Sequence, residues 1–345
     1  MKPVRLAWAG MRQRAALAAI TLLATACSAP DPPPTTPAAG PPPAAEPAKA
    51  PPAGTAPSGT VVPAGAAAEG IVADGVTHRV AVGVRDPDGL ALLDSTTGRV
   101  TGKVPLPGHL RHLQLAAPGG PVLVPDENSD RLLTVDLPSG QITGDVRTGA
   151  SPHDATRAAN GRMFSANEFG RSVAVTENGT VVHTFTDVTQ PAGLAAAGNL
   201  VGLVDVRQND LSVYDAATLT RTARLPAGAG PTHVTVDRRG HFAVIDTRGN
   251  AVRFFDPAAP AHALTSLALP GTPYGTAYDA TRDRLWVTLT AKNQLVGIDL
   301  AGTTPKVFTT VATVRQPNTV AVDPTTGTCY VTGTADGTVE IVNPG

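Results

Sequence analysis

The 345-residue sequence predicts an all-β fold, a seven-bladed β-propeller over residues 60–345, from two features of an internal repeat. Short apolar runs end in an acid or amide every 38 to 44 residues, and another apolar run ends ten residues before each of these positions. Such a unit of several short strands, without a 3.6-residue pattern, is typical of propeller blades rather than of helical repeats. The later endings are Asp94, Asp136, Glu177, Asp215, Asp256, Asp299 and Asn343, and the earlier ones are Val84, Asp126, Asn167, Asp205, Asp246, Leu289 and Gly333.

The last repeat lacks a fourth strand, and the sequence before the first repeat supplies one. The seventh unit stops after its third strand, at Val342, whereas residues 60–65 (TVVPAG) are similar to residues 103–108 (KVPLPG) and 224–228 (RLPAG), which close other blades. We therefore expect the N-terminal strand to complete the last blade, which closes the ring and removes an exposed sheet edge. Residues 60–345 then form one domain, and we expect a monomer.

The N-terminus carries the pattern of a bacterial secretory signal. Residues 1–14 contain four basic residues and no acid, and residues 15–26 are small or apolar, a stretch too short for a bilayer span of roughly 20 residues. The alternative is a core helix, but nothing downstream is helix-like for it to pack on. Residues 23–27 (LATAC) resemble the lipobox of bacterial lipoproteins, although Ala24 stands where that motif most often has Leu. The resemblance implies a signal peptide over residues 1–26, lipidation of Cys27, and anchoring on the extracytoplasmic face of the cell membrane.

Residues 27–59 are expected to be the lipidated cysteine followed by a disordered, Pro- and Ala-rich tether. Between residues 30 and 63 lie 13 of the 33 prolines of the chain. Such a segment buries too little apolar surface to offset its ordering entropy, so we expect a semi-extended, polyproline-like spacer. At roughly 3 Å per residue it would hold the propeller up to the order of 100 Å from the bilayer. A Pro-rich docking ligand is the alternative.

Charge and composition argue against a nucleic-acid partner. Lys and Arg number 27 against 28 Asp and Glu, and loss of the four bases of the signal leaves 23 against 28, a net charge of about −5. A mildly acidic chain with 4% aromatic residues argues against a nucleic-acid partner. With Cys27 lipidated, Cys329 is expected to be a small buried residue. No Gly-x-Ser-x-Gly, Walker-type or Cys-x-x-Cys motif occurs, and we expect no cofactor.

The seventh repeat resembles a known family. Residues 330–333 (YVTG) with 335–339 (ADGTV), preceded by 316–324 (QPNTVAVDP), are similar to the YVTN-type β-propeller repeat of bacterial extracytoplasmic proteins. Gly333 stands where the family pattern has Asn, and Asn167 holds the equivalent place in another repeat. The resemblance implies a propeller of the binding or surface type and transfers little chemistry.

A ligand site is expected at the mouth of the central channel. In a propeller, the loop into each innermost strand and the loop between the second and third strands open on one face, which forms a concave place. The predicted ligand-binding residues are Glu69, Arg111, His112, His153, Asp154, His233, Tyr274 and Asn318, with the strand-end residues Asp126, Asn167, Asp205 and Asp246. The facing loops add Glu127, Glu168, Arg207, Arg248 and Lys292. The alternative role of the strand-end residues is to cap a turn, and the three histidines can also reflect a repeat that tolerates His.

These features favour a non-catalytic ligand- or protein-binding module of the bacterial cell envelope, whose partner is an envelope protein or a small molecule. The alternative is a propeller enzyme, streptogramin-lyase-like or lactone-hydrolase-like, that uses His and carboxylate groups at the mouth. Residues 284–288 (RLWVT) are similar to the Trp-containing second strand of streptogramin lyases, but the paired His and Glu signature of those enzymes is missing. His and Asp are suitable metal ligands, but no short ligand spacing supports a metal site, and we expect none.

Overall fold

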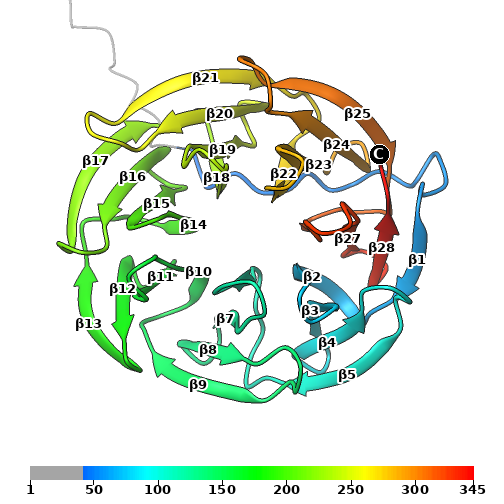
Figure 1. Ribbon diagram of the computed structural model, residues 1–345, viewed down its shortest axis with the longest axis horizontal. Helices are drawn as coiled ribbons and strands as arrows, with labels where there is room; N and C mark the ends of the chain where they lie inside the picture. Colours follow the sequence, from blue (N-terminus) through cyan, green and yellow to red (C-terminus); the bar gives the residue numbers. More distant parts are fainter. Residues whose placement is uncertain (1–41) are drawn as a thin grey trace, which may run out of the picture. The chain divides into compact units, whose positions relative to one another are not determined.

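The computed structural model describes residues 42–345, and every regular element within them is a β-strand. Seven four-stranded antiparallel sheets stand around a central channel (Figure 1), which confirms the predicted seven-bladed propeller. Blade 1 consists of β2 (Ala66–Asp74), β3 (Arg79–Arg85), β4 (Gly89–Asp94) and β5 (Val100–Pro105), and blade 2 of β6 (Gln114–Leu115), β7 (Val122–Asp126), β8 (Arg131–Val135) and β9 (Ile142–Arg147). Blade 3 consists of β10 (Pro152–Arg157), β11 (Met163–Asn167), β12 (Ser172–Glu177) and β13 (Thr180–Phe185).

The remaining blades repeat this order, with the first strand of each innermost. Blade 4 consists of β14 (Pro191–Ala197), β15 (Leu200–Asp205), β16 (Asp210–Asp215) and β17 (Thr220–Pro226), and blade 5 of β18 (Pro231–Val236), β19 (Phe242–Asp246), β20 (Ala251–Asp256) and β21 (His262–Ala268). Blade 6 consists of β22 (Pro273–Asp279), β23 (Arg284–Leu289), β24 (Gln294–Asp299) and β25 (Lys306–Ala312), and blade 7 of β26 (Val320–Val322), β27 (Cys329–Gly333), β28 (Thr338–Val342) and β1 (Thr60–Pro63). Within residues 42–345 there is no helix of the length and apolarity needed to cross a membrane.

The two ends of the propeller sequence meet in blade 7. Strand β1 pairs with β28 in antiparallel register, from Thr60 opposite Ile341 to Pro63 opposite Thr338, so the predicted closure by the N-terminal strand is confirmed. A buried carboxylate reinforces the closure, because Glu340 accepts a hydrogen bond from the Gly59 N–H at 2.7 Å and from the Val314 N–H at 2.9 Å.

The hydrophobic core lies between neighbouring blades. Leu90 and Leu92 of β4 pack in one cluster with Val122 of β7 and Leu133 of β8, which joins blades 1 and 2. The blades thus bury their flat faces against each other, which leaves their inner edges and loops free to form the channel and its mouth.

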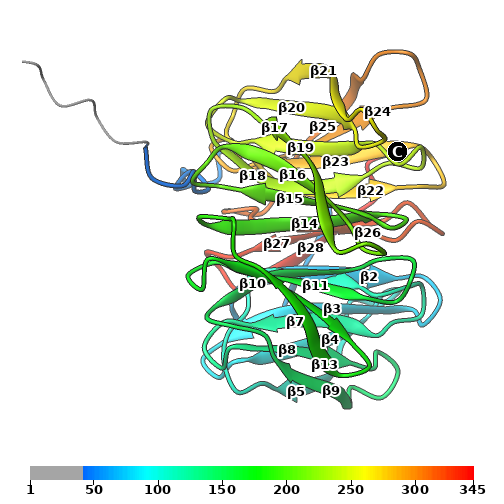
Figure 2. The same ribbon diagram turned by 90° about the vertical axis from the view of Figure 1, so that its left-hand side faces the viewer.

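The described part of the proline-rich segment lies against the propeller. In Figure 1 it crosses the ring from the neighbourhood of β18, past β22, to β1, and the side view in Figure 2 shows its start at one face. Residues 42–51, called the strap below, thus differ from the free spacer expected over residues 27–59. A polyproline-like strand makes no internal hydrogen bonds, so its backbone N–H and C=O groups are available to side chains of the propeller. The predicted signal peptide and Cys27 lie outside the described residues.

Candidate functional site

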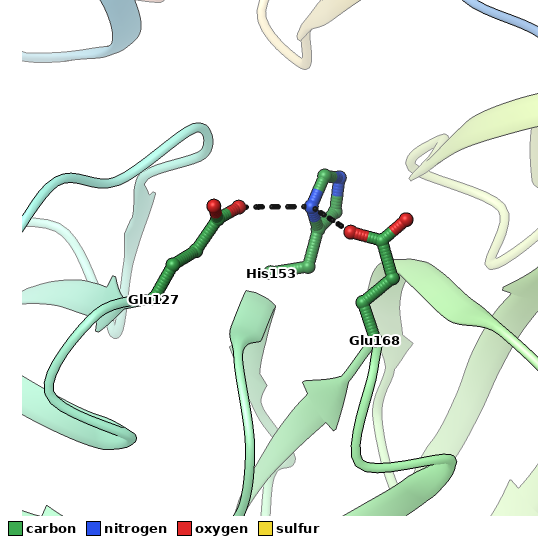
Figure 3. A group of neighbouring side chains, drawn as sticks. All are labelled: Glu127, His153 and Glu168. Carbon is green, nitrogen blue, oxygen red and sulfur yellow. Dashed lines mark hydrogen bonds and ion pairs between the residues drawn. The ribbon is translucent and has the colours of Figure 1, made fainter.

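Three charged side chains meet at the channel mouth (Figure 3). Nδ1 of His153 lies 3.2 Å from Oε1 of Glu127 and 3.1 Å from Oε2 of Glu168. His153 belongs to β10, the innermost strand of blade 3, while Glu127 follows β7 of blade 2 and Glu168 follows β11 of blade 3. The three side chains are 7%, 10% and 9% exposed, respectively. They form a nearly buried set of ion pairs, called the histidine cluster below.

The repeat places the two glutamates. Each directly follows a strand-end residue, Asp126 or Asn167, whose side chain bonds to the backbone of a neighbouring loop. The N–H groups of Glu127 and Glu168 each donate at 2.9 Å to a carbonyl of the loop that leads into their own blade. Because the two residues occupy one repeat position in adjacent blades, both carboxylates reach the same part of the channel.

The cluster fixes the charge of His153. Burial alone would lower the pKa of this imidazole, but the hydrogen bonds and charges of Glu127 and Glu168 outweigh burial and raise it to about 10. Burial would likewise raise the pKa of Glu168, but the bond to His153 lowers it to about 2. His153 is therefore an imidazolium at neutral pH, held between two carboxylates.

Two neutral histidines lie beside the charged one. The ring centroid of His112 is 4.7 Å from that of His153 and 4.7 Å from that of His233, and His233 stands 4.4 Å from Tyr274. Burial, and then repulsion from the neighbouring imidazoles, lowers the pKa of His112 well below its usual value. The same two effects lower the pKa of His233 to about 3. The structure thus brings the three predicted histidines together with only one of them charged.

Arg111 extends the cluster toward the strap. Its guanidinium Nε lies 3.6 Å from Oε1 of Glu127, and its Nη1 lies 3.9 Å from Oε2 of Glu46 in the strap. Glu127 also accepts a hydrogen bond from Nε2 of His109 at 2.9 Å. Glu127 is therefore surrounded by positively polarised groups, a role that the sequence did not assign to it or to His109.

Glu69 and Asn318 form a separate pair on the same mouth. The Asn318 amide donates to Oε1 of Glu69 at 3.0 Å, and Arg85 lies 3.6 Å from Oε2 of Glu69. Neither predicted residue has a hydrogen bond or ion pair with the histidine cluster among the described residues.

The four strand-end residues face the loops. Asp126, Asn167, Asp205 and Asp246 are 0 to 2% exposed. Asp205 accepts from the Thr189 N–H at 2.6 Å, and Asp246 accepts from the Gly230 N–H at 2.9 Å. These side chains hold the loops that carry the mouth residues, which is the capping role described above as the alternative.

Asp154 faces away from the mouth. Its carboxylate accepts hydrogen bonds from Nε2 of Gln114 at 3.0 Å and from the Leu194 N–H at 2.8 Å. Burial raises the pKa of Asp154 to about 7, against these bonds. Asp154 lines a cavity of about 440 Å³ formed by the later residues of the innermost strands, such as Thr156 and Arg157. His112 and His233 line this cavity as well, whereas the histidine cluster does not. Asp154 therefore shares a cavity with two of the predicted histidines but not with His153.

The space directly under the strap is small. A cavity of about 20 Å³ is lined by His153, Glu168, His233 and Tyr274 together with Ala45 and Glu46 of the strap. That volume holds about one water molecule. A larger ligand cannot occupy the mouth together with the strap.

The donor set of the cluster suits a divalent cation as well as a proton. One nitrogen and two oxygens from Glu127, His153 and Glu168 lie within 4.8 Å of one another. A metal ion would bind Nδ1 of His153 only after the proton had left this atom. Because the pKa of His153 is high, loss of the proton costs free energy at neutral pH, which lowers the affinity for the metal. The sequence placed both glutamates in the facing loops but not among the ligand-binding residues. Their shared position, one residue after a strand end, is the signal that identifies them.

The fold and this mouth define a seven-bladed β-propeller with a buried, ion-paired histidine at its channel mouth. No protein-family model and no curated protein matches the chain. Solved structures of similar fold include hydrazine synthase of Kuenenia stuttgartiensis (16% identity over 81% of this chain and 95% of that one, TM-score 0.69) and a streptogramin B lyase (15% identity over 84% and 97%, TM-score 0.69). A chain of the mitotic checkpoint complex is also similar (13% identity over 86% and 97%, TM-score 0.70). These proteins differ in function, so the similarity establishes the fold and does not identify a function. The resemblance to YVTN-type repeats stays a prediction.

Proposed function

We propose that this protein is a non-catalytic binding module of the bacterial cell envelope that takes its ligand at the channel mouth. The observation that carries the proposal is the geometry of the histidine cluster, in which two nearly buried carboxylates lie within 3.2 Å of Nδ1 of His153. With both carboxylates on Nδ1 and a pKa of about 10, His153 is protonated at neutral pH and cannot accept a proton as a general base. A rigid, preorganised set of charges in a concave place suits the orientation of a ligand by hydrogen bonds.

The proposed location follows from the lipobox-like segment. Cys27 would carry the lipid, and the acyl chains would supply stable anchoring without a spanning helix.

Affinity capture tests the binding proposal. The full chain is immobilised and exposed to an envelope extract, and the bound species is identified by native mass spectrometry. The His153→Gln/Arg111→Ala variant should lose the ligand, and the ligand should be recovered from the native chain with unchanged mass. The exposed His262 provides a matched control, since His262→Gln lies on the outer strand β21 and should capture normally. Equal capture by the mouth variant would place the binding site elsewhere.

An enzyme remains the second candidate, because His153 lies within hydrogen-bond reach of two carboxylates. An imidazolium of this kind would act as a general acid rather than as a base. The similarity in fold to a streptogramin B lyase makes a cyclic ester a reasonable probe. Incubation of the native chain with streptogramin B and with simple lactones tests this candidate. The products are separated by chromatography and fragmented in a mass spectrometer, because ring opening by elimination leaves the mass unchanged whereas hydrolysis adds one water. Ring opening by the native chain that is absent from His153→Gln would favour the enzyme over the binding module.

A further inference from the structure

We propose that the channel mouth is a binding site for an extended, proline- and alanine-rich peptide, and that the strap occupies this site in cis. This inference rests on the proposed function and specifies its ligand class. The strap crosses several blades and closes over the mouth without being part of any sheet. Its contacts with the propeller therefore show what kind of ligand the mouth surface recognises.

The surface binds the C-terminal half of the strap through its backbone. The side-chain amide of Gln316 donates from Nε2 to Ala48 O at 2.9 Å and accepts at Oε1 from the Ala50 N–H at 2.8 Å. One amide thus pairs with two backbone groups of an extended strand, as the next strand of a sheet would. Thr290 accepts from the Ala48 N–H at 3.0 Å, and Asn293 donates to Pro51 O at 3.0 Å.

The N-terminal half is bound by two arginines in equivalent loops. Arg207, between β15 and β16, donates to Pro42 O at 2.9 Å, and Arg248, between β19 and β20, donates to Pro43 O at 2.5 Å. Both are hydrogen bonds from a charged donor, which are stronger than bonds between neutral groups. Proline has no backbone N–H and can offer only its carbonyl as an acceptor. Side chains that donate hydrogen bonds, such as arginine, are therefore suited to bind a proline-rich strand.

Ala45 of the strap lies over the mouth, against Gly230, and this place, called the seat below, accepts only a small side chain. Ala45 is 8% exposed, and a Cβ on Gly230 would lie 2.9 Å from the Ala45 Cβ, so the glycine makes room for the strap. The remaining cavity of about 20 Å³ has no room for a longer side chain at residue 45. Beyond this seat, Glu46 lies over Arg111 at 3.9 Å, an exposed pair that adds little affinity.

These contacts define the ligand class. Side chains from four blades form hydrogen bonds with the backbone carbonyl and N–H groups of an extended strand, and the seat over the mouth holds a small residue. A polyproline-like chain is preformed in this shape, so it binds with a low ordering cost. Because the strap is covalently attached to β1, its local concentration is of millimolar order, and it masks the site from the same peptide in solution.

The experiment separates the strap from its site in the full chain. In the release variant Ala45→Leu/Ala48→Pro, leucine overfills the seat and proline removes the N–H that Thr290 accepts. The control Ala56→Leu/Ala53→Pro makes the same two changes at exposed residues. Tryptic cleavage after Lys49 measures strap release, since Lys49 is the basic residue of the strap and its neighbours are hydrogen-bonded. The release variant should be cut at least tenfold faster than the native chain and the control.

The probe is a fluorescent peptide with the sequence of residues 42–51 (PPAAEPAKAP), measured by anisotropy. It should bind the release variant at least tenfold more tightly than the native chain or the control, and a reversed-sequence peptide should bind more weakly. Adding Gln316→Ala to the release variant should weaken the peptide at least fivefold.

Three results would overturn the proposal. Rapid cleavage without peptide binding would mean that the mouth holds the strap only because it is tethered. Equal binding to native and release chains would mean that the strap does not occupy the site, and unchanged cleavage would mean that these contacts do not hold it. Capture from the envelope extract is therefore run with the native chain and with the release variant. Capture by the release variant alone would indicate masking by the strap, whereas no capture by either chain would reject the proposed function itself.

Discussion

Nδ1 of His153 lies 3.1 Å from Oε2 of Glu168, and both residues belong to blade 3. The second carboxylate on the same nitrogen comes from blade 2, so the cluster joins two blades at the mouth. Its stability and its pH dependence can be measured without knowledge of the ligand.

Removal of His153 should destabilise the fold. The His153→Ala variant leaves Glu127 and Glu168 nearly buried without their shared partner, and the loss of one member of a buried pair costs about 3 kcal/mol. Urea unfolding at pH 7 measures this change. His262→Ala, at an exposed position, should change the free energy of unfolding by less than about 0.5 kcal/mol. A His153→Ala variant as stable as this control would contradict the ion pairs described here.

The same cluster should make stability fall on the alkaline side. The pKa of His153 is about 10 in the folded state against 6.5 when unfolded, so between these values the folded state holds a proton that the unfolded chain has lost. The contribution is complete below pH 6.5 and is lost as the pH rises through 10, by up to about 1.4 kcal/mol per pH unit. The free energy of unfolding of the native chain, minus that of His153→Gln, should therefore decline from pH 7 to pH 10. Parallel curves for the two chains would contradict the raised pKa.

On the acidic side the lowered pKa of Glu168, about 2 against 4.5, gives the opposite sign. Its contribution is present above pH 4.5 and is lost as the pH falls toward 2, so the pair stabilises the fold most fully between pH 4.5 and 6.5. A Glu168→Gln variant should lack this acid-side decline. An equal decline in this variant would assign the effect to other carboxylates.

Ring closure should depend on Glu340. The Glu340→Ala variant leaves the Gly59 and Val314 N–H groups without their acceptor, at an expected cost of about 2 kcal/mol. Amide hydrogen exchange in β1 should accelerate more than exchange in the central strands of other blades. Glu177→Ala, in a partly exposed pair with Arg162, is the matched control and should cost less than about 1 kcal/mol. Unchanged exchange in β1 would show that β-pairing alone closes the ring.

Membrane anchoring should depend on Cys27. In cells, the full chain should partition into the detergent phase of Triton X-114, and Cys27→Ala should move it to the aqueous phase. The other cysteine, Cys329, is fully buried in β27, so Cys329→Ala should retain detergent partitioning. Detergent partitioning of Cys27→Ala would refute the proposed anchor.

The sequence by itself determined the blades, because each blade is a local unit whose strands and turns recur with one period. The closure of the ring was also predictable, since TVVPAG at residues 60–65 matches the fourth strands of other blades. The sequence also placed the three histidines around the mouth. Their convergence does not follow from equivalent positions, because the register makes Asp154 the equivalent of His233: each pairs with the residue just before a strand end. His153 lies one residue earlier, so only the tertiary structure brings it against the other two histidines.

Only the tertiary structure decided which mouth residues meet. His153 and Asp154 are neighbours in sequence, yet β10 directs one toward Glu127 and Glu168 and the other toward Gln114. The strap was unpredictable for a similar reason, because its composition is that of a free spacer and its partners are distant, as with Ala48 and Thr290, which are 242 residues apart. Composition determines the conformation that a proline-rich segment prefers in isolation. The position of the strap on the propeller depends instead on hydrogen-bonding side chains that four separate blades bring to one surface.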